Sequence, residues 1–165
     1  MNKKRSIIWV VSLTIAVFII WNVVITFYVK DKEGIVSNIA EVPYIGEYLR
    51  DFETTGNIKY VCSLNNFRGS AGIITGISSP EAFEKFISKD KNWHNGGSDD
   101  MADFWASRCQ DFGKSFDEFP IGNSVEDPYL TNSFKKDGRA IQIELAYRLS
   151  DNRFSIYFMN LFDEK

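Results

Sequence analysis

The sequence predicts an α+β protein in which an N-terminal transmembrane helix is followed by one extracytoplasmic domain. Three observations predict this class. Residues 6–29 contain no charged side chain, apolar residues alternate before residue 78 and again after residue 138, and two amphipathic helical patterns lie between those regions. We therefore expect an antiparallel sheet of about five strands, in the order ββααβββ, with two helices on one face.

The uncharged segment has the properties of a membrane anchor. A helix over residues 6–29 would span roughly 36 Å, more than the roughly 30 Å of a bilayer's hydrocarbon core. The segment is longer than the apolar core of a cleaved signal peptide, and no pair of small residues follows it. Lys3, Lys4 and Arg5 predict that residues 1–5 stay in the cytoplasm. The sequence thus predicts a single-pass signal-anchor in the bacterial inner (plasma) membrane, with the C-terminal domain periplasmic or otherwise extracytoplasmic.

Residues 30–56 are predicted to form a juxtamembrane tether before a folded domain at residues 57–165. Pro43 interrupts any continuous helix, so we expect a short helix, a turn and a second helical turn in this segment. The polar residues from Asp51 to Asn57 mark the expected domain boundary.

The first two strands of the domain are predicted as a hairpin. Apolar residues alternate from Ile58 to Leu64 and from residue 71 to residue 77. Gly72 and Gly76 lie on one face of the second strand, where missing side chains allow another element to approach closely. A packed helix is the expected neighbour, with the backbone of a ligand as the alternative.

Two helices follow the hairpin. Serine, proline and glutamate at residues 79–81 are typical of a helix start, and this helix is expected to end near Lys91. Residues 93–97 form a predicted glycine-rich loop. Ser98 then caps a second helix, whose apolar stripe lies within residues 101–112 and is expected to pack on the sheet.

The end of the chain carries the clearest strand signal. Residues 141–149 alternate between apolar and polar side chains, as in a strand with one buried face. Turn signals flank this strand at residues 137–138 and 150–152. The last strand, Arg153 to Phe162, is apolar on both faces, which predicts a central position in the sheet.

The two cysteines, Cys62 and Cys109, lie on the predicted oxidising side of the membrane. Strand alternation turns Cys62 inward and helical spacing turns Cys109 inward, so we predict a disulfide that stabilises the fold by roughly 4 kcal/mol. Two separate buried thiols are the alternative. Two cysteines and one histidine do not supply the four ligands of a structural zinc site, and no metal or cofactor is predicted.

Acidic residues dominate the chain beyond the anchor. All 22 acidic residues but only 15 of the 19 basic residues follow residue 30, which leaves a net charge of −7 there and disfavours a nucleic-acid partner. Residues 99–127 alone have a net charge of −6. They predict an acidic face for a protein partner, with an ordinary solvated exterior as the alternative. The residues of this predicted face are Asp99, Asp100, Asp103, Asp117, Glu118, Glu126 and Asp127.

The only histidine, His94, follows Trp93 in the glycine-rich loop. These two residues are a candidate ligand loop, in which His94 would act as a general base or bind a ligand beside nearby carboxylates. An exposed loop residue is the alternative interpretation. No GxSxG elbow, HExxH helix, phosphate loop or EF-hand pattern occurs, so no catalytic residue is assigned. A catalytic pair of distant carboxylates, such as Glu118 and Glu126, is a further alternative.

Together these observations predict a non-enzymatic, membrane-anchored protein whose extracytoplasmic domain binds another protein in the bacterial envelope. Two forms of this function are expected: an accessory subunit of a membrane complex, or an immunity-type inhibitor of an envelope-directed toxin. The alternative is a small envelope enzyme or ligand receptor that uses the His94 loop. A third hypothesis is a structural spacer. No motif identifies the partner.

Overall fold

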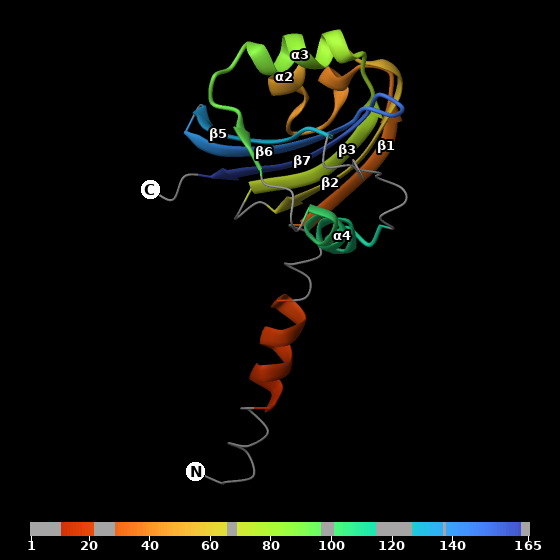
Figure 1. The fold of residues 1–165 in the computed structure, drawn as a ribbon. Coiled ribbons are helices and arrows are strands. Elements are labelled where there is room, and N and C mark those ends of the chain that lie inside the picture. Colours follow the sequence, from red (N-terminus) through yellow and green to blue (C-terminus); the bar gives the residue numbers. More distant parts are fainter. Residues whose placement is uncertain are drawn as a thin grey trace, which may run out of the picture. The chain divides into compact units, whose positions relative to one another are not determined.

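The computed structural model describes residues 11–21, 29–65, 69–96, 101–114, 127–136 and 138–162. The chain forms two compact units, Met1–Lys30 and Asp31–Lys165. The larger unit is built around a seven-stranded sheet with the strand order β1-β2-β3-β7-β6-β5-β4 (Figure 1). The pairs β2–β3, β3–β7, β7–β6, β6–β5 and β5–β4 are all antiparallel.

The elements have the following bounds. The strands are β1 Val29–Val36, β2 Thr55–Asn65, β3 Gly69–Ile77, β4 His94–Asn95, β5 Tyr129–Lys136, β6 Arg139–Arg148 and β7 Arg153–Phe162. The helices of the larger unit are η1 Ile39–Glu41, α2 Gly46–Leu49, α3 Pro80–Ser88 and α4 Met101–Asp111. In the smaller unit, the described residues 11–21 are helical.

Several local predictions are confirmed. β2 and β3 form the expected hairpin, with Cys62 opposite Gly72. The Ser79 side chain accepts a hydrogen bond from the backbone N–H of Ala82 and so caps α3. β7 is the middle strand of the sheet, between β3 and β6. These features depend on side-chain patterns within a few residues, which a sequence displays directly.

The predicted number of strands is wrong, because β1 and β4 were not expected. β4 consists of His94 and Asn95, which pair with Thr131 and Leu130 of β5 inside the segment predicted as a loop. β1 covers a charged segment, Val29–Val36, that lacks the alternation of a half-buried strand. Both strands lie at an edge of the sheet, where backbone pairing on one side is sufficient and the side-chain pattern is weak.

The prediction that both helices share one face is also wrong. α3 and α4 lie on opposite faces of the sheet (Figure 1). Phe83 of α3 belongs to a core that includes Ile74 and Phe158, which we call the α3-side core. Trp105 of α4 packs with Ile73 and other residues of the opposite face, which form the α4-side core. Successive strand residues point to opposite faces, so this one sheet serves two hydrophobic cores.

The segment predicted as a tether contributes to the α3-side core. Ile39, Val42, Ile45, Leu49 and Phe52 are each at most 3% exposed. They form η1, α2 and the turns around these helices, on the same face as α3 (Figure 1). Residues 39–52 are therefore an integral part of the folded unit.

The glycines predicted to allow close approach face aromatic rings of β7. A Cβ atom at Gly72 would lie 2.7 Å from the Phe158 ring, and one at Gly76 would lie 2.9 Å from the Phe154 ring. The aromatic rings lie where the sequence predicts a packed helix. The small residues of β3 instead let two large rings of the neighbouring strand pack in the α3-side core.

The predicted transmembrane helix is corrected. Among the residues that the structure describes, no helix is both long and apolar enough to cross a membrane. Residue 29, the predicted end of the anchor, begins β1. The prediction of a single-pass signal-anchor in the bacterial inner membrane, with a periplasmic domain, rested on that helix and is wrong by this finding. Residues 1–10 and 22–28 lie outside the described residues.

The predicted disulfide is wrong as well. Cys62 and Cys109 are both buried thiols that do not form a disulfide. Cys62 lies in the α3-side core, whereas Cys109 packs in the α4-side core with Val61. Both side chains point inward, as predicted, but they lie on opposite sides of the sheet. The sheet therefore separates the two thiols. The alternative of two separate buried thiols is confirmed.

We expect both thiols to react with Ellman's reagent only after unfolding. Burial raises the pKa of the Cys62 thiol to about 12, which suppresses the reactive thiolate at neutral pH. Protein purified without reductant should show two thiols per chain in denaturant, and a reductant should leave the melting temperature unchanged. A Cys62→Ser variant, which should show one thiol, is the control. A thiol count near zero in denaturant would contradict the structure.

Candidate functional site

Most of the predicted acidic face lies outside the described residues. This applies to Asp99, Asp100, Asp117, Glu118 and Glu126, and to the side chain of Asp103. The remaining member, Asp127, is 9% exposed. Its carboxylate accepts a hydrogen bond of 2.9 Å from the backbone N–H of Leu149, next to the β6–β7 turn. Asp127 therefore has a structural contact, and the acidic face stays a prediction.

The candidate ligand loop is divided between the core and the surface. Trp93 is half-buried, and its ring centroid lies 5.9 Å from that of Phe86 in α3. His94 is exposed on β4. In the described part of the chain, no group of three or more His, Cys, Asp or Glu side chains could hold a metal ion. The ligand-binding role of this loop stays a prediction.

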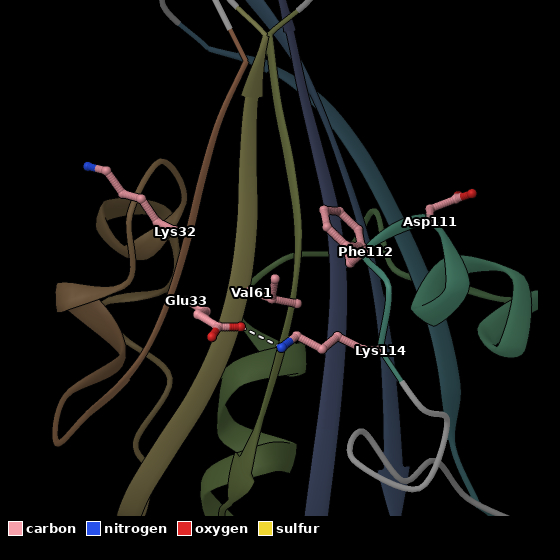
Figure 2. A pocket seen from close by; sticks show the side chains of 6 residues that line it. All are labelled: Lys32, Glu33, Val61, Asp111, Phe112 and Lys114. Carbon is pink, nitrogen blue, oxygen red and sulfur yellow. Dashed lines mark hydrogen bonds and ion pairs between the residues drawn. The ribbon is translucent and has the colours of Figure 1, made fainter. Parts of the chain in front are cut away.

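A pocket of about 190 Å³ lies beside the β1 edge of the sheet (Figure 2). Val61 of β2 and Phe112, which follows α4, provide apolar surface. Glu33 of β1 and Lys114 meet across the pocket, and Lys32 points away from them (Figure 2). The Lys32 ammonium lies 5.4 Å from the centre of the Tyr44 ring. The sixth lining residue is Asp111.

The end of α4 determines where Lys114 lies. Gly113 has a positive φ of 64°, and its N–H donates to the carbonyl of Gln110, while the N–H of Lys114 donates to the carbonyl of Cys109. These two bonds form a Schellman motif, which ends a helix by satisfying its last carbonyls. The chain then turns toward β1, and the ammonium of Lys114 reaches the carboxylate of Glu33.

The Lys114–Glu33 ion pair joins the end of α4 to the edge strand. The two charged atoms are 2.5 Å apart, and the side chains are 22% and 66% exposed, respectively. An ion pair this close to solvent contributes about 1 kcal/mol or less to stability. It nevertheless shows that the carboxylate of Glu33 can hold a primary amine at this pocket.

β1 is the terminal strand on this side of the sheet and has eight residues. Within the described residues its outer edge has no neighbouring strand. Such an edge presents backbone N–H and C=O groups that can pair with another polypeptide. Ile35 of β1 is 66% exposed. The opposite edge of the sheet is the two-residue β4, which offers far less backbone.

A second feature lies under α4, where Glu144 of β6 is only 4% exposed. Its carboxylate accepts hydrogen bonds of 3.0 Å from the Tyr129 hydroxyl and the Gln142 amide. Burial raises the pKa of the Glu144 carboxyl, and burial together with that nearby carboxylate raises the pKa of Tyr129. The guanidinium of Arg108 in α4 lies 4.7 Å from the ring centre of Tyr157. The arrangement is a hydrogen-bonded acid between the sheet and α4.

The sequence placed Gln142 and Glu144 on the solvent-facing side of their strand, so it missed this cluster. The strand does alternate, but α4 covers the face on which these polar residues lie (Figure 1). A glutamate and a glutamine on a strand with apolar partners ordinarily indicate an exposed face. The position of α4 is what buries Glu144 and leaves Gln142 half-buried beside it.

No family model, curated protein or solved structure matches this chain. The candidate sites therefore rest on geometry and charge. They are the β1 edge with its adjacent pocket, and the buried cluster around Glu144.

Replacing Glu144 with glutamine should weaken the dependence of stability on pH. The pKa of this carboxyl in the folded protein is raised above the ordinary value of 4.5, so the folded state holds the proton more tightly than the unfolded state. Its contribution is fully present below pH 4.5 and is lost as pH rises through the folded-state pKa, by about 1.4 kcal/mol for each pH unit between the two pKa values. Thermal unfolding from pH 4 to pH 8 would measure this loss.

Glu84→Gln, at an exposed position of α3, is the matched control and should keep the wild-type pH profile. The wild-type protein should lose this contribution to stability as pH rises and the Glu144→Gln variant should not, so the melting temperature of the variant should rise relative to that of the wild type. A constant difference across that range would contradict the buried, protonatable state of Glu144.

Proposed function

We propose that this protein is a non-enzymatic protein-binding module that recognises an extended segment of a different protein at the β1 edge. The observation that carries the proposal is an eight-residue terminal strand beside a pocket with apolar surface and charged walls. A partner segment would add as a further strand, with affinity from backbone hydrogen bonds and specificity from a side chain in the pocket. This proposal keeps the binding function that the sequence predicts and does not include a membrane anchor.

Charge on β1 favours a different protein over a second copy of this chain. Glu33 points toward Lys114 on the α4 side, whereas Lys32 lies against Tyr44. Two antiparallel copies paired about Glu33 would place the two Glu33 carboxylates directly opposite each other, and pairing about Lys32 would do the same with two ammonium groups. Like charges in such pairs are destabilising. Charged edge strands also resist unspecific strand addition.

The pocket beside β1 fits a basic side chain of the partner. The aliphatic stem of a lysine or arginine would lie on Val61 and Phe112, and its charge would reach Glu33. Lys114 already makes this contact from within the chain, so a partner's basic side chain would compete with it. A basic partner also agrees with the net charge of −7 beyond residue 30.

The two predicted forms of this function differ in how the protein purifies. An accessory subunit would copurify with its partner from the source cells. An inhibitor would purify alone and would bind only after its target is added. Both forms would use the same edge, so the experiments below apply to either.

A photo-crosslinking residue at position 35 should capture the partner. Ile35 is 66% exposed on β1, and Leu149, which is 49% exposed in the β6–β7 turn, is the control position. Irradiating source cells that carry p-benzoylphenylalanine at either position should give one discrete adduct from position 35 and none from position 149. Mass spectrometry would identify the captured protein. No adduct from position 35, or equal adducts from both positions, would overturn the proposal.

Substitutions of the two charged residues should change partner affinity in opposite directions. Glu33→Gln removes the carboxylate that would hold the partner's basic side chain and should weaken binding roughly tenfold, or about 1.4 kcal/mol. Lys114→Met removes the internal competitor and should strengthen binding. Calorimetry with the purified partner would measure both, with Glu47→Gln on α2 as the control. Equal losses in both variants would show that the ion pair matters only for the fold.

A further inference from the structure

A second pocket of about 210 Å³ lies on the α4 side of the sheet, near the ends of β2 and β3 and the start of β7. Lys59 lies two residues before Val61 on β2, and Thr75 lies two residues after Ile73 on β3. Val61 and Ile73 belong to the α4-side core, so the side chains of Lys59 and Thr75 lie on the same face of the sheet. The lining residues are Asn57, Lys59, Thr75, Gly76, Ile77 and Arg153. None of them lines the pocket beside β1.

A bulge in β2 creates this hollow. Thr55 lies opposite Ile77 and Lys59 lies opposite Thr75, so three residues of β2 face the single Gly76 of β3. Gly56 permits the irregular backbone with a positive φ of 72°. Bulges of this kind bend a strand and redirect its side chains, and they are frequent beside functional sites.

Two cationic side chains flank the hollow from different strands. Lys59 is paired with Thr75, and Arg153 of β7 is paired with Ile77, so the two cations lie on either side of β3 with an offset of two residues. With strands about 4.8 Å apart and a rise of about 3.3 Å per residue, their Cα atoms are about 12 Å apart. Lysine and arginine side chains each extend on the order of 6 Å, so both charges can converge on one group above Gly76.

The six lining residues include two cations and no acid, although the chain beyond residue 30 is acidic overall. Asp151 lies 3.4 Å from Arg153, but its two carboxylate oxygens also accept hydrogen bonds of 2.8 and 2.5 Å from Arg148. Asp151 is thus shared between two arginines, and it does not line the hollow. An anion is the ligand class that complements a hollow lined by a lysine and an arginine.

We propose that this pocket binds a small oxyanion, either a carboxylate or a phosphate group, between Lys59 and Arg153. Arg153 would hold two oxygens through its planar guanidinium, and Lys59 would act as a point charge. The side-chain amide of Asn57 is a further donor, and Ile77, which is 42% exposed, provides an apolar wall. The volume is below the roughly 300 Å³ at which drug-sized ligand pockets begin, so a single small anion fits best. This site is independent of the proposed β1 edge.

Amide shifts in the intact, ¹⁵N-labelled protein would test the site. Sodium phosphate and sodium succinate would be titrated separately, with sodium chloride holding the ionic strength constant. At least one anion should produce saturable shifts at residues 57, 59, 76 and 153, and the one that saturates identifies the ligand class. Lys59→Gln and Arg153→Gln should each weaken binding roughly tenfold. Lys135→Gln, at an exposed position of β5, is the control and should bind as wild type does.

An Arg153→Lys variant separates a built site from simple charge attraction. It keeps the charge but loses the two-oxygen contact, so it should bind more weakly than wild type and more tightly than Arg153→Gln. The same spectra report whether each variant is folded. Shifts that stay linear for both anions would overturn the proposal, and so would saturable binding that survives in a folded Lys59→Gln, Arg153→Gln double variant.

Discussion

β7 carries apolar side chains on both faces, and the other elements of the folded unit are arranged so as to cover them. Phe154, Ile156 and Phe158 pack against the face that η1, α2 and α3 cover, while Tyr157 and Met159 pack on the α4 side. A strand buried on both faces needs a neighbouring strand on each side and a helical layer above and below. The central place of β7 and the division of the core into two parts follow from that need.

The two cores explain why inward-pointing groups do not meet. Cys62 and Cys109 are both completely buried, yet a sheet lies between them. The same division places Glu144 in a dry environment, because α4 closes the face that the strand pattern assigns to solvent. Tyr129 and Gln142 donate hydrogen bonds to this carboxyl, and such partners are what a buried polar group requires. Burial of this one acid is thus a consequence of where a helix packs.

The edges of the sheet obey a weaker constraint than its centre. β1 needs a neighbour on one side only, so it tolerates Lys32 and Glu33 where a central strand would not. The polar depressions that the structure describes lie away from the centres of both cores. One is beside β1 and the other is at the bulge of β2. Packing in the middle of the sheet and binding at its margins therefore fall mainly to different residues, with Val61 contributing to both the α4-side core and the pocket beside β1.

Short-range chemistry was enough to predict the features whose causes lie within a few residues. Ser79 and Pro80 start α3, Gly138 turns the chain between β5 and β6 with a φ of 72°, and the two-sided apolar pattern of residues 153–162 predicts the middle strand. The face on which α4 packs, the pairing of β1 and the burial of Glu144 could not be predicted in this way. They depend on contacts between distant residues, such as Lys114 and Glu33, which are 81 positions apart. An alternating pattern separates the two faces of a strand, but it carries no information on which helix will cover each face.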